Sequence, residues 1–330
     1  MRARRYVIVA VTRASFQLGR WAVSFAALAL GLSMAQTSAA QSSMVRINAT
    51  ARPVFYNDGD TFRVLAGPLR QRSARLAGFN TLESYGSVHR WGGWTAHELY
   101  ANAKQATLNA RRGKWSCQIN PSEKDGYGRL LAVCPDLAAD QIRKGLAHGL
   151  SVAGPSPWPL IRAQRRAIVE RRGMWAKGVP ALVLTSLHSV NERFDNADNY
   201  NRLVSPLDGV STKWKHQELY RECQEVCFRA KAAERAGLSA VIAALRADDA
   251  TADVIKQIED PYLFVVLDEY VATGRVAQVF KRDGHKAVKS KLDALLAAGA
   301  FGPLEDKNVS CMVYVTFERR YRPPKAECLK

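Results

Sequence analysis

Long apolar runs are lacking from this sequence. The longest one, from Trp21 to Leu32, is about twelve residues long, whereas a membrane-spanning helix needs roughly 20. Arginines precede this run and small residues follow it, an order that is typical of a secretory signal peptide. We therefore predict that residues 1–40 form a signal peptide, with cleavage near Ala35 or Ala40, and that the mature protein is secreted or periplasmic without a stable membrane span. An uncleaved N-terminal membrane anchor is the alternative.

Acidic residues are scarce in the first half of the chain. Residues 45–180 contain 21 Lys and Arg but 9 Asp and Glu, a balance of +12, whereas residues 181–330 contain 22 and 21, a balance of +1. A surface with such an excess of positive charge attracts polyanions. The first part of the chain is therefore predicted to favour polyanions as partners. Adhesion of a basic secreted protein to an anionic envelope surface is the alternative.

Cysteine is sparse, with six residues in 330. An even number in an exported chain indicates disulfides before metal ligands. Cys117 and Cys134 flank a predicted hairpin at matching places, so we predict that they pair.

The other four cysteines lie in the second half of the chain. Cys223 and Cys227 are four residues apart in a predicted helix, so each is expected to pair with Cys311 or Cys328 rather than with its neighbour. Zinc coordination by these four residues is the alternative. The histidines in the chain offer no metal-ligand spacing; those considered are His148, His188, His216 and His285.

Carboxylates and an arginine are concentrated in one stretch, residues 57–83. Asp60, Arg75 and Glu83 stand at the ends of short alternating segments, an arrangement that can bring acid and base into one cleft. Arg129 follows a tight turn further along the chain. Divalent cations prefer oxygen ligands, a phosphodiester is bound well by guanidinium groups, and an attacking water needs a carboxylate. These residues therefore predict phosphodiester chemistry.

Apolar alternation in the first part predicts a small β-barrel. The strands are expected at 45–56, 61–65, 70–77, 115–120 and 130–134. Helices are expected at 95–110, 137–150 and 158–175, with an irregular loop at 84–94. Five strands with three helices in this order are compatible with a five-stranded barrel of the oligonucleotide-binding (OB) type.

Residues beyond 180 do not continue this pattern. Residues 181–212 are rich in Asn, Pro and Gly and are interpreted as a polar linker. A mainly helical C-terminal domain of unknown fold and function is expected over 213–330, and its partner is unknown. Its helices are predicted at 213–236, 238–247, 252–259, 262–272 and 286–298, with a strand at 309–318.

Several motifs of residues 45–175 together resemble the staphylococcal nuclease (thermonuclease) family. They are DGDT at 58–61, RLAGFNTLE at 75–83, DGYGR at 125–129, KGLA at 144–147 and RRGMW at 171–175. Each motif is weak alone, but their order and spacing make chance similarity improbable. The resemblance implies a five-stranded barrel with three helices and calcium-dependent cleavage of DNA or RNA.

The resemblance also implies roles for single residues. Asp60 would be a metal ligand, Thr81 would offer its backbone carbonyl, and Asn80 stands at a further metal position. Arg75 and Arg129 would bind the scissile phosphate, and Glu83 would orient or deprotonate the attacking water. Tyr127, in the DGYGR turn, is a candidate substrate-binding residue.

Three residues depart from the family pattern. Asn80 replaces a metal-binding aspartate, Leu82 replaces a proline, and Ser151 replaces a tyrosine. The loss of one ligand charge predicts a weakened calcium site, which Asn80→Asp would strengthen. If the site is instead rebuilt to work without that carboxylate, the same substitution lowers activity. The alternative function is a nucleic-acid-binding module of the same fold with weakened or no catalysis.

Overall fold

The computed structural model describes residues 42–192, 199–316, 318–319, 324 and 326–329. The predicted signal peptide, residues 1–40, lies outside this part of the chain. Among the described helices, none has both the length and the hydropathy that a membrane crossing requires.

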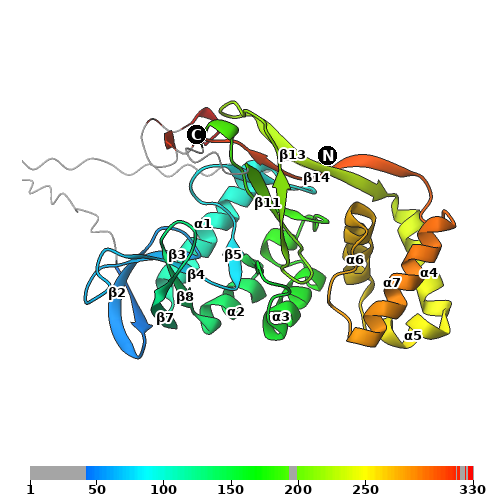
Figure 1. The fold of residues 1–330 in the computed structure, drawn as a ribbon, viewed down its shortest axis with the longest axis horizontal. Helices are drawn as coiled ribbons and strands as arrows, with labels where there is room; N and C mark the ends of the chain where they lie inside the picture. Colours follow the sequence, from blue (N-terminus) through cyan, green and yellow to red (C-terminus); the bar gives the residue numbers. More distant parts are fainter. Residues whose placement is uncertain (1–41, 193–198, 317, 320–323, 325, 330) are drawn as a thin grey trace, which may run out of the picture. The chain divides into compact units, whose positions relative to one another are not determined.

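Six strands close into a barrel in the order β1-β2-β3-β4-β8-β7. Strands β2, β3, β4, β7 and β8 of this barrel are labelled in Figure 1. They are β1 Ser43–Ile47, β2 Thr50–Tyr56, β3 Thr61–Val64, β4 Ser73–Leu76, β7 Trp115–Lys124 and β8 Leu130–Val133. Parallel pairing of β1 with β7 and of β4 with β8 closes the ring. The predicted barrel is thus confirmed, but five strands were predicted and six are present. The strand expected at 45–56 is a hairpin, because Asn48 and Ala49 take positive φ values of 46° and 70° and reverse the chain.

The barrel interior contains the apolar residues that alternate along these strands. In β1, for example, Val45 and Ile47 are buried while Met44 and Arg46 are exposed. Cys117 lies in this core and forms a disulfide with Cys134, as the sequence predicted. Burying one face of each strand fixes the strand register, since a shift by one residue would turn every apolar side chain outward.

Three helices accompany the barrel, and two of them are shorter than predicted. They are α1 Ala96–Arg112, α2 Pro135–Arg143 and α3 Trp158–Val169. The capping box of Thr95 and Glu98 fixes the start of α1. Gly145, with a φ of 66°, turns the chain after α2, so part of the helix expected at 137–150 becomes strand β9, Ala147–Gly149. Similarly, Arg171 has a φ of 52°, and the end of the predicted third helix is the short 3₁₀ helix η1, Gly173–Trp175.

Two small sheets hold the segments that follow β4. Strand β5, Phe79–Thr81, pairs with β9. Strand β6, Val88–Arg90, lies inside the stretch predicted as an irregular loop and pairs with β14, Leu304–Val313, near the C-terminus. The C-terminal part of the chain therefore supplies a strand beside the segment that carries Glu83.

The stretch predicted as a linker contains strands instead. Strands β10 Val183–Ser186, β11 Tyr200–Val204 and β12 Ser211–Lys215 form an antiparallel sheet, and η2, Val190–Glu192, lies between the first two. Apolar residues of this stretch, including Val183, Leu184 and Val204, are fully buried. Their burial outweighs the Asn, Pro and Gly content on which the linker interpretation was based.

The C-terminal part contains four α-helices close to the positions predicted from residue 238 onward, and it also contains two long strands. Its elements are β13 Glu225–Ala233, α4 Arg235–Ala247, α5 Asp249–Ile255, α6 Asp260–Thr273, α7 Arg282–Ala297, β14 and η3 Glu327–Leu329. The helix expected at 213–236 is replaced by β12, a loop and β13. Pairing of β13 with β14 and the Cys227–Cys311 disulfide stabilise the strand against its helical propensity. The remaining disulfide joins Cys223 to Cys328. Cys223 and Cys227 therefore do not pair with each other, as expected.

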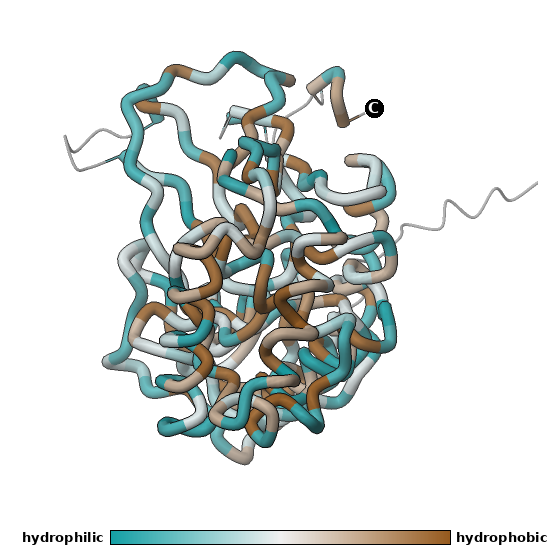
Figure 2. Tube along the Cα trace, turned by 90° about the vertical axis from the view of Figure 1, so that its right-hand side faces the viewer, coloured by the Kyte–Doolittle hydropathy of each residue, from teal (hydrophilic) through white to brown (hydrophobic). Residues whose placement is uncertain are grey.

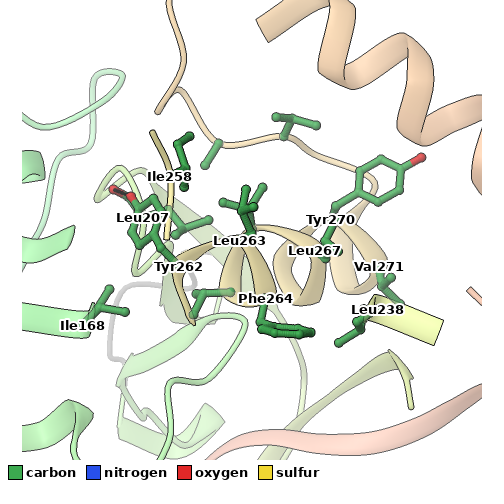
Figure 3. Close-up of a cluster of buried hydrophobic side chains, with 14 of the residues drawn as sticks. Ile168, Leu207, Leu238, Ile258, Tyr262, Leu263, Phe264, Leu267, Tyr270 and Val271 are labelled. Carbon is green, nitrogen blue, oxygen red and sulfur yellow. Dashed lines mark hydrogen bonds between the residues drawn. The ribbon is translucent and has the colours of Figure 1, made fainter. Parts of the chain in front are cut away.

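Helix α6 lies at the centre of the largest hydrophobic cluster (Figure 3). Its residues 262–267 are all apolar and buried, which is typical of a helix in the interior of a protein. This cluster contains Leu207, Ile168 of α3 and Leu238 of α4. The regions predicted as separate domains therefore share one hydrophobic core. Figure 2 shows apolar residues running through the interior of the trace.

Candidate active site

Three neighbouring segments bring the predicted site residues together at one end of the barrel. Asp60 is the last residue before β3, Arg75 lies in β4, and Asn80 and Thr81 lie in β5. The register of β3 and β4 pairs Thr61 with Arg75, which places the guanidinium beside the carboxylate of Asp60. Because only two residues separate β4 from β5, Asn80 and Thr81 also lie beside Asp60 and Arg75.

The carboxylate of Asp60 accepts four hydrogen bonds from neighbouring residues of the site, and only 3% of the residue's surface is exposed. Its Oδ1 accepts hydrogen bonds from Arg75 Nη1 and from Thr61 Oγ1, the latter at 3.2 Å. Its Oδ2 accepts from the backbone amide of Thr81 at 2.7 Å and from Thr81 Oγ1 at 3.2 Å. Burial raises the pKa of Asp60, but the Arg75 charge and the Thr81 amide outweigh it and hold the pKa below its usual value.

Asp58 adds a second carboxyl group to the cluster. Its Oδ1 accepts a hydrogen bond from the Asp60 amide at 3.1 Å. Burial, the Asp60 carboxylate and the Glu83 carboxylate raise the pKa of Asp58 well above its ordinary value, and Arg75 only partly opposes them. The pKa of Arg75 is raised, because the three carboxylates outweigh its burial. The site thus has more negative charge than one guanidinium neutralises.

Asn80 connects the cluster to a buried histidine. Its Oδ1 accepts from Arg75 Nη2, and its Nδ2 donates to the Thr81 carbonyl at 2.8 Å. On its other side, Nδ2 lies 3.4 Å from Nε2 of His148, which is fully buried in β9. Burial lowers the pKa of His148 to about 4, so the ring is neutral near pH 7.

Glu83 follows two residues after β5 and is partly buried. Its backbone amide donates to Nε2 of His89 at 3.1 Å. Burial lowers the pKa of His89 to about 3, and the electrostatic interaction with nearby His148 acts in the same direction. The neutral ring of His89 is therefore a permanent acceptor for the segment that carries Glu83.

Arg129 stands beside the cluster without bonding to it in the described structure. Its Nε donates to Asp125 Oδ2 at 2.7 Å, and its guanidinium lies 5.5 Å from the ring centre of Tyr127. Extending the parallel register of Ala74 and Leu130 by one residue places Arg129 next to Ser73, on the same outer barrel face as Arg75. Tyr127 is 76% exposed at the tip of this hairpin.

The structure thus brings together Asp60, Arg75, Asn80 and Thr81, with Glu83 near them and the Arg129–Tyr127 turn on the adjoining strand. Sequence reasoning missed three residues: Asp58, which belongs to the DGDT motif but was given no role, and His89 and His148. The DGDT motif was a usable signal for Asp58, because it places a second carboxylate two residues before Asp60. No local pattern distinguishes the two histidines.

The oxygen donors of the cluster are of the kind that a hard divalent cation prefers. Among the described residues, however, only Glu225, Cys227 and Cys311 bring three potential side-chain ligand atoms within 4.8 Å of one another, so the carboxylates of the cluster are not gathered into a preformed site. Asp58, Asp60 and Glu83 offer carboxylate oxygens, and Thr81 offers a backbone carbonyl, the ligand types that Ca²⁺ prefers. Burial raises the pKa of Asp58 most, and the neighbouring carboxylates of Asp60 and Glu83 raise it further; a bound cation would oppose the contribution of these two charges. The side-chain oxygen of Asn80, by contrast, faces Arg75.

Zinc is excluded for the cysteines, because all six form disulfides. Glu225, Cys227 and Cys311 do lie close together, but both sulfurs belong to one disulfide and are not thiolate ligands. The three disulfides indicate an oxidising environment. Comparison with protein-family models and with curated proteins returned no match for this chain.

Proposed function

We propose that this chain is an exported, metal-dependent nuclease that hydrolyses phosphodiester bonds of DNA or RNA on an OB-type barrel of the staphylococcal nuclease kind. One observation carries the proposal: Asp58, Asp60 and Arg75 are clustered at one end of the barrel with Thr81, and Glu83 follows two residues later. The cluster combines oxygen ligands, a guanidinium group and a nearby carboxylate, which are the groups that phosphodiester hydrolysis requires.

The division of roles follows from the contacts. Asp58, Asp60 and the Thr81 carbonyl would hold Ca²⁺, which when bound supplies positive charge to the phosphate oxygens. Arg75 and Arg129 bind the scissile phosphate from two adjacent strands and stabilise the charge that develops in the transition state. Glu83 orients or deprotonates water, and His89 holds its backbone amide. Tyr127, exposed beside Arg129, contacts the nucleic acid.

A second candidate is a nucleic-acid-binding module that has lost hydrolysis. The contact that favours it is the hydrogen bond from Asn80 Nδ2 to the Thr81 carbonyl, the oxygen proposed to bind the metal. The positive balance of residues 45–180 serves both functions.

An assay of the purified mature protein on single-stranded DNA, duplex DNA and RNA tests the proposal. We expect cleavage with Ca²⁺, no cleavage with a chelator, and loss of on the order of a hundredfold in kcat for Glu83→Gln, a near-isosteric control. Binding without cleavage in Ca²⁺, Mg²⁺ and Mn²⁺ would favour the binding module. If the protein neither cleaves nor binds nucleic acid, both functions are wrong.

A further inference from the structure

Asn80 and His148 face each other across two paired strands, next to the carboxylate cluster. Strands β5 and β9 are antiparallel, and their register pairs Asn80 with His148. The exposed fractions of these two residues are 6% and 0%. A polar pair at this depth is stable only if each donor meets an acceptor, so the direction of every hydrogen bond can be worked out from the partners.

The partners of the His148 ring show which nitrogen carries the proton. Nδ1 lies 2.8 Å from the carbonyl oxygen of Gly149, which can only accept, so Nδ1 is the donor. In a neutral ring Nε2 then has the free lone pair, and it faces Nδ2 of Asn80. Gly149 is itself held in place, because its amide donates to Gln164 Oε1 at 2.6 Å. The ring of His148 is thus held by the Gly149 carbonyl, on the side opposite to Asn80.

The same reasoning fixes the amide of Asn80. Nδ2 has two hydrogens, of which one is donated to the Thr81 carbonyl and the other points to His148 Nε2. Oδ1 is therefore turned to Arg75 and accepts from Nη2. A flipped amide would set Oδ1 against two acceptors and an N–H group against the guanidinium. Since Arg75 also donates to Asp60 through Nη1, its guanidinium is held at both ends.

We propose that His148 is a positioning residue of the site, which holds the Asn80 amide in the one orientation that directs the guanidinium of Arg75. Its effect on turnover rests on the proposed nuclease function, whereas the hydrogen-bond chain does not. Asn80 then serves as a neutral link between His148 and Arg75 and has no role as a cation ligand.

The chain also determines the outcome of Asn80→Asp. A carboxylate at this position would place an oxygen acceptor opposite the Thr81 carbonyl and opposite Nε2 of His148, where Nδ2 now donates. Unmatched buried acceptors destabilise the arrangement that holds Arg75. We therefore expect Asn80→Asp to lower kcat, and not to strengthen the site as the loss of a ligand charge alone would suggest.

Three variants of His148 separate positioning from simple burial. In His148→Gln the side-chain oxygen can reach the place of Nε2, in His148→Asn the side chain keeps only the shorter contact toward Gly149, and His148→Leu has no polar group. We expect near-normal kcat for Gln and a loss of roughly tenfold to a hundredfold for Asn and Leu, with KM changed less, because a misplaced Arg75 loses contacts made in the transition state. Equal kcat values for all folded variants would overturn the proposal.

A measurement without substrate tests the chain itself. The protein has six histidines, so ¹⁵N-histidine labelling gives a simple NMR spectrum, and His148→Gln assigns the His148 ring. We expect a proton on Nδ1 of His148 and none on Nε2, and a shift of the Nε2 resonance in Asn80→Ala, where its donor is lost. A proton on Nε2, or an unmoved resonance, would overturn the proposal. An inactive protein that shows the expected spectrum would instead refute only the nuclease function.

Discussion

The ring of His89 accepts a hydrogen bond from the backbone amide of Glu83, with 3.1 Å between the nitrogen atoms. His89 belongs to β6 and is opposite Met312 of β14. Next to this pairing, the Val315 amide donates to Ser87 Oγ at 3.1 Å. The C-terminal part of the chain, to which the sequence assigned no role, therefore fixes the backbone around the candidate general base.

The first prediction concerns this contact. His89→Leu removes the acceptor of the Glu83 amide, and the loss of this hydrogen bond in a partly buried segment should cost about 1–3 kcal/mol of stability. Because Glu83 then loses its fixed position, kcat should fall by at least about tenfold. Unfolding by denaturant and steady-state kinetics check the two effects. His89→Gln, whose oxygen can occupy the place of Nε2, is the matched control, and an equal kcat in both variants would contradict the prediction.

The sequence predicted the barrel and most of its site because the signals were local. Apolar alternation predicts buried strand faces, and the motifs around Asp60, Arg75 and Thr81 lie in or next to short strands that the sheet topology brings together. The hairpin at Asn48 and Ala49 was missed, because neither residue is a glycine and the turn depends on φ values that Ala rarely adopts.

Residues that depend on distant partners could not be predicted. His148 lies in the three-residue strand β9, within a stretch whose sequence has helical periodicity. Only the turn at Gly145 separates this strand from helix α2. His89 depends on a strand more than 200 residues away in the chain. Strand β13 has the Ala, Lys and Arg content of a helix, but pairing with β14 and the Cys227–Cys311 disulfide override that preference.

A second prediction separates the two arginines of the site. Arg75→Ala leaves the buried carboxylate of Asp60 without its cation, which should cost on the order of 3 kcal/mol of stability. Arg129 pairs with a partly exposed Asp125, so Arg129→Ala should cost less than about 1 kcal/mol. Both variants should lose roughly a hundredfold in kcat. Parallel denaturation curves and kinetics measure this, and equal destabilisation by both substitutions would count against the cluster described here.

A third prediction concerns the hairpin that carries Arg129. The Cys117–Cys134 bond has a sequence separation of 17 residues, and closing a loop of this size stabilises a protein by about 3 kcal/mol in the loop-entropy model. Cys117→Ala with Cys134→Ala should therefore lower the free energy of unfolding by about that amount. Mass spectrometry of the non-reduced wild-type protein checks that the bond forms. If both thiols are free in the exported protein, the prediction is wrong at its first step.

The last prediction is a pH dependence of stability that arises at Glu269. Glu269 in α6 is fully buried, bonds to Arg275 and accepts from Ser205 Oγ at 2.5 Å, while Asp208 binds the same arginine at 2.7 and 3.0 Å. Burial, together with the Asp208 charge, raises the pKa of Glu269 to about 7, although Arg275 and Ser205 oppose the shift.

A raised carboxyl pKa means that the folded protein binds a proton that the unfolded chain has already released. The stabilising contribution of Glu269 is therefore complete below its ordinary pKa of 4.5 and is lost as the pH rises to about 7. The loss should amount to on the order of 3 kcal/mol across this window. Glu269→Gln cannot titrate, so the difference in unfolding free energy between wild type and variant should change by that amount between the two pH values. Denaturant unfolding of both proteins at several pH values measures this difference, because the other titrating groups contribute equally to wild type and variant. If the difference in unfolding free energy does not vary with pH, Glu269 keeps its charge throughout and the prediction is wrong.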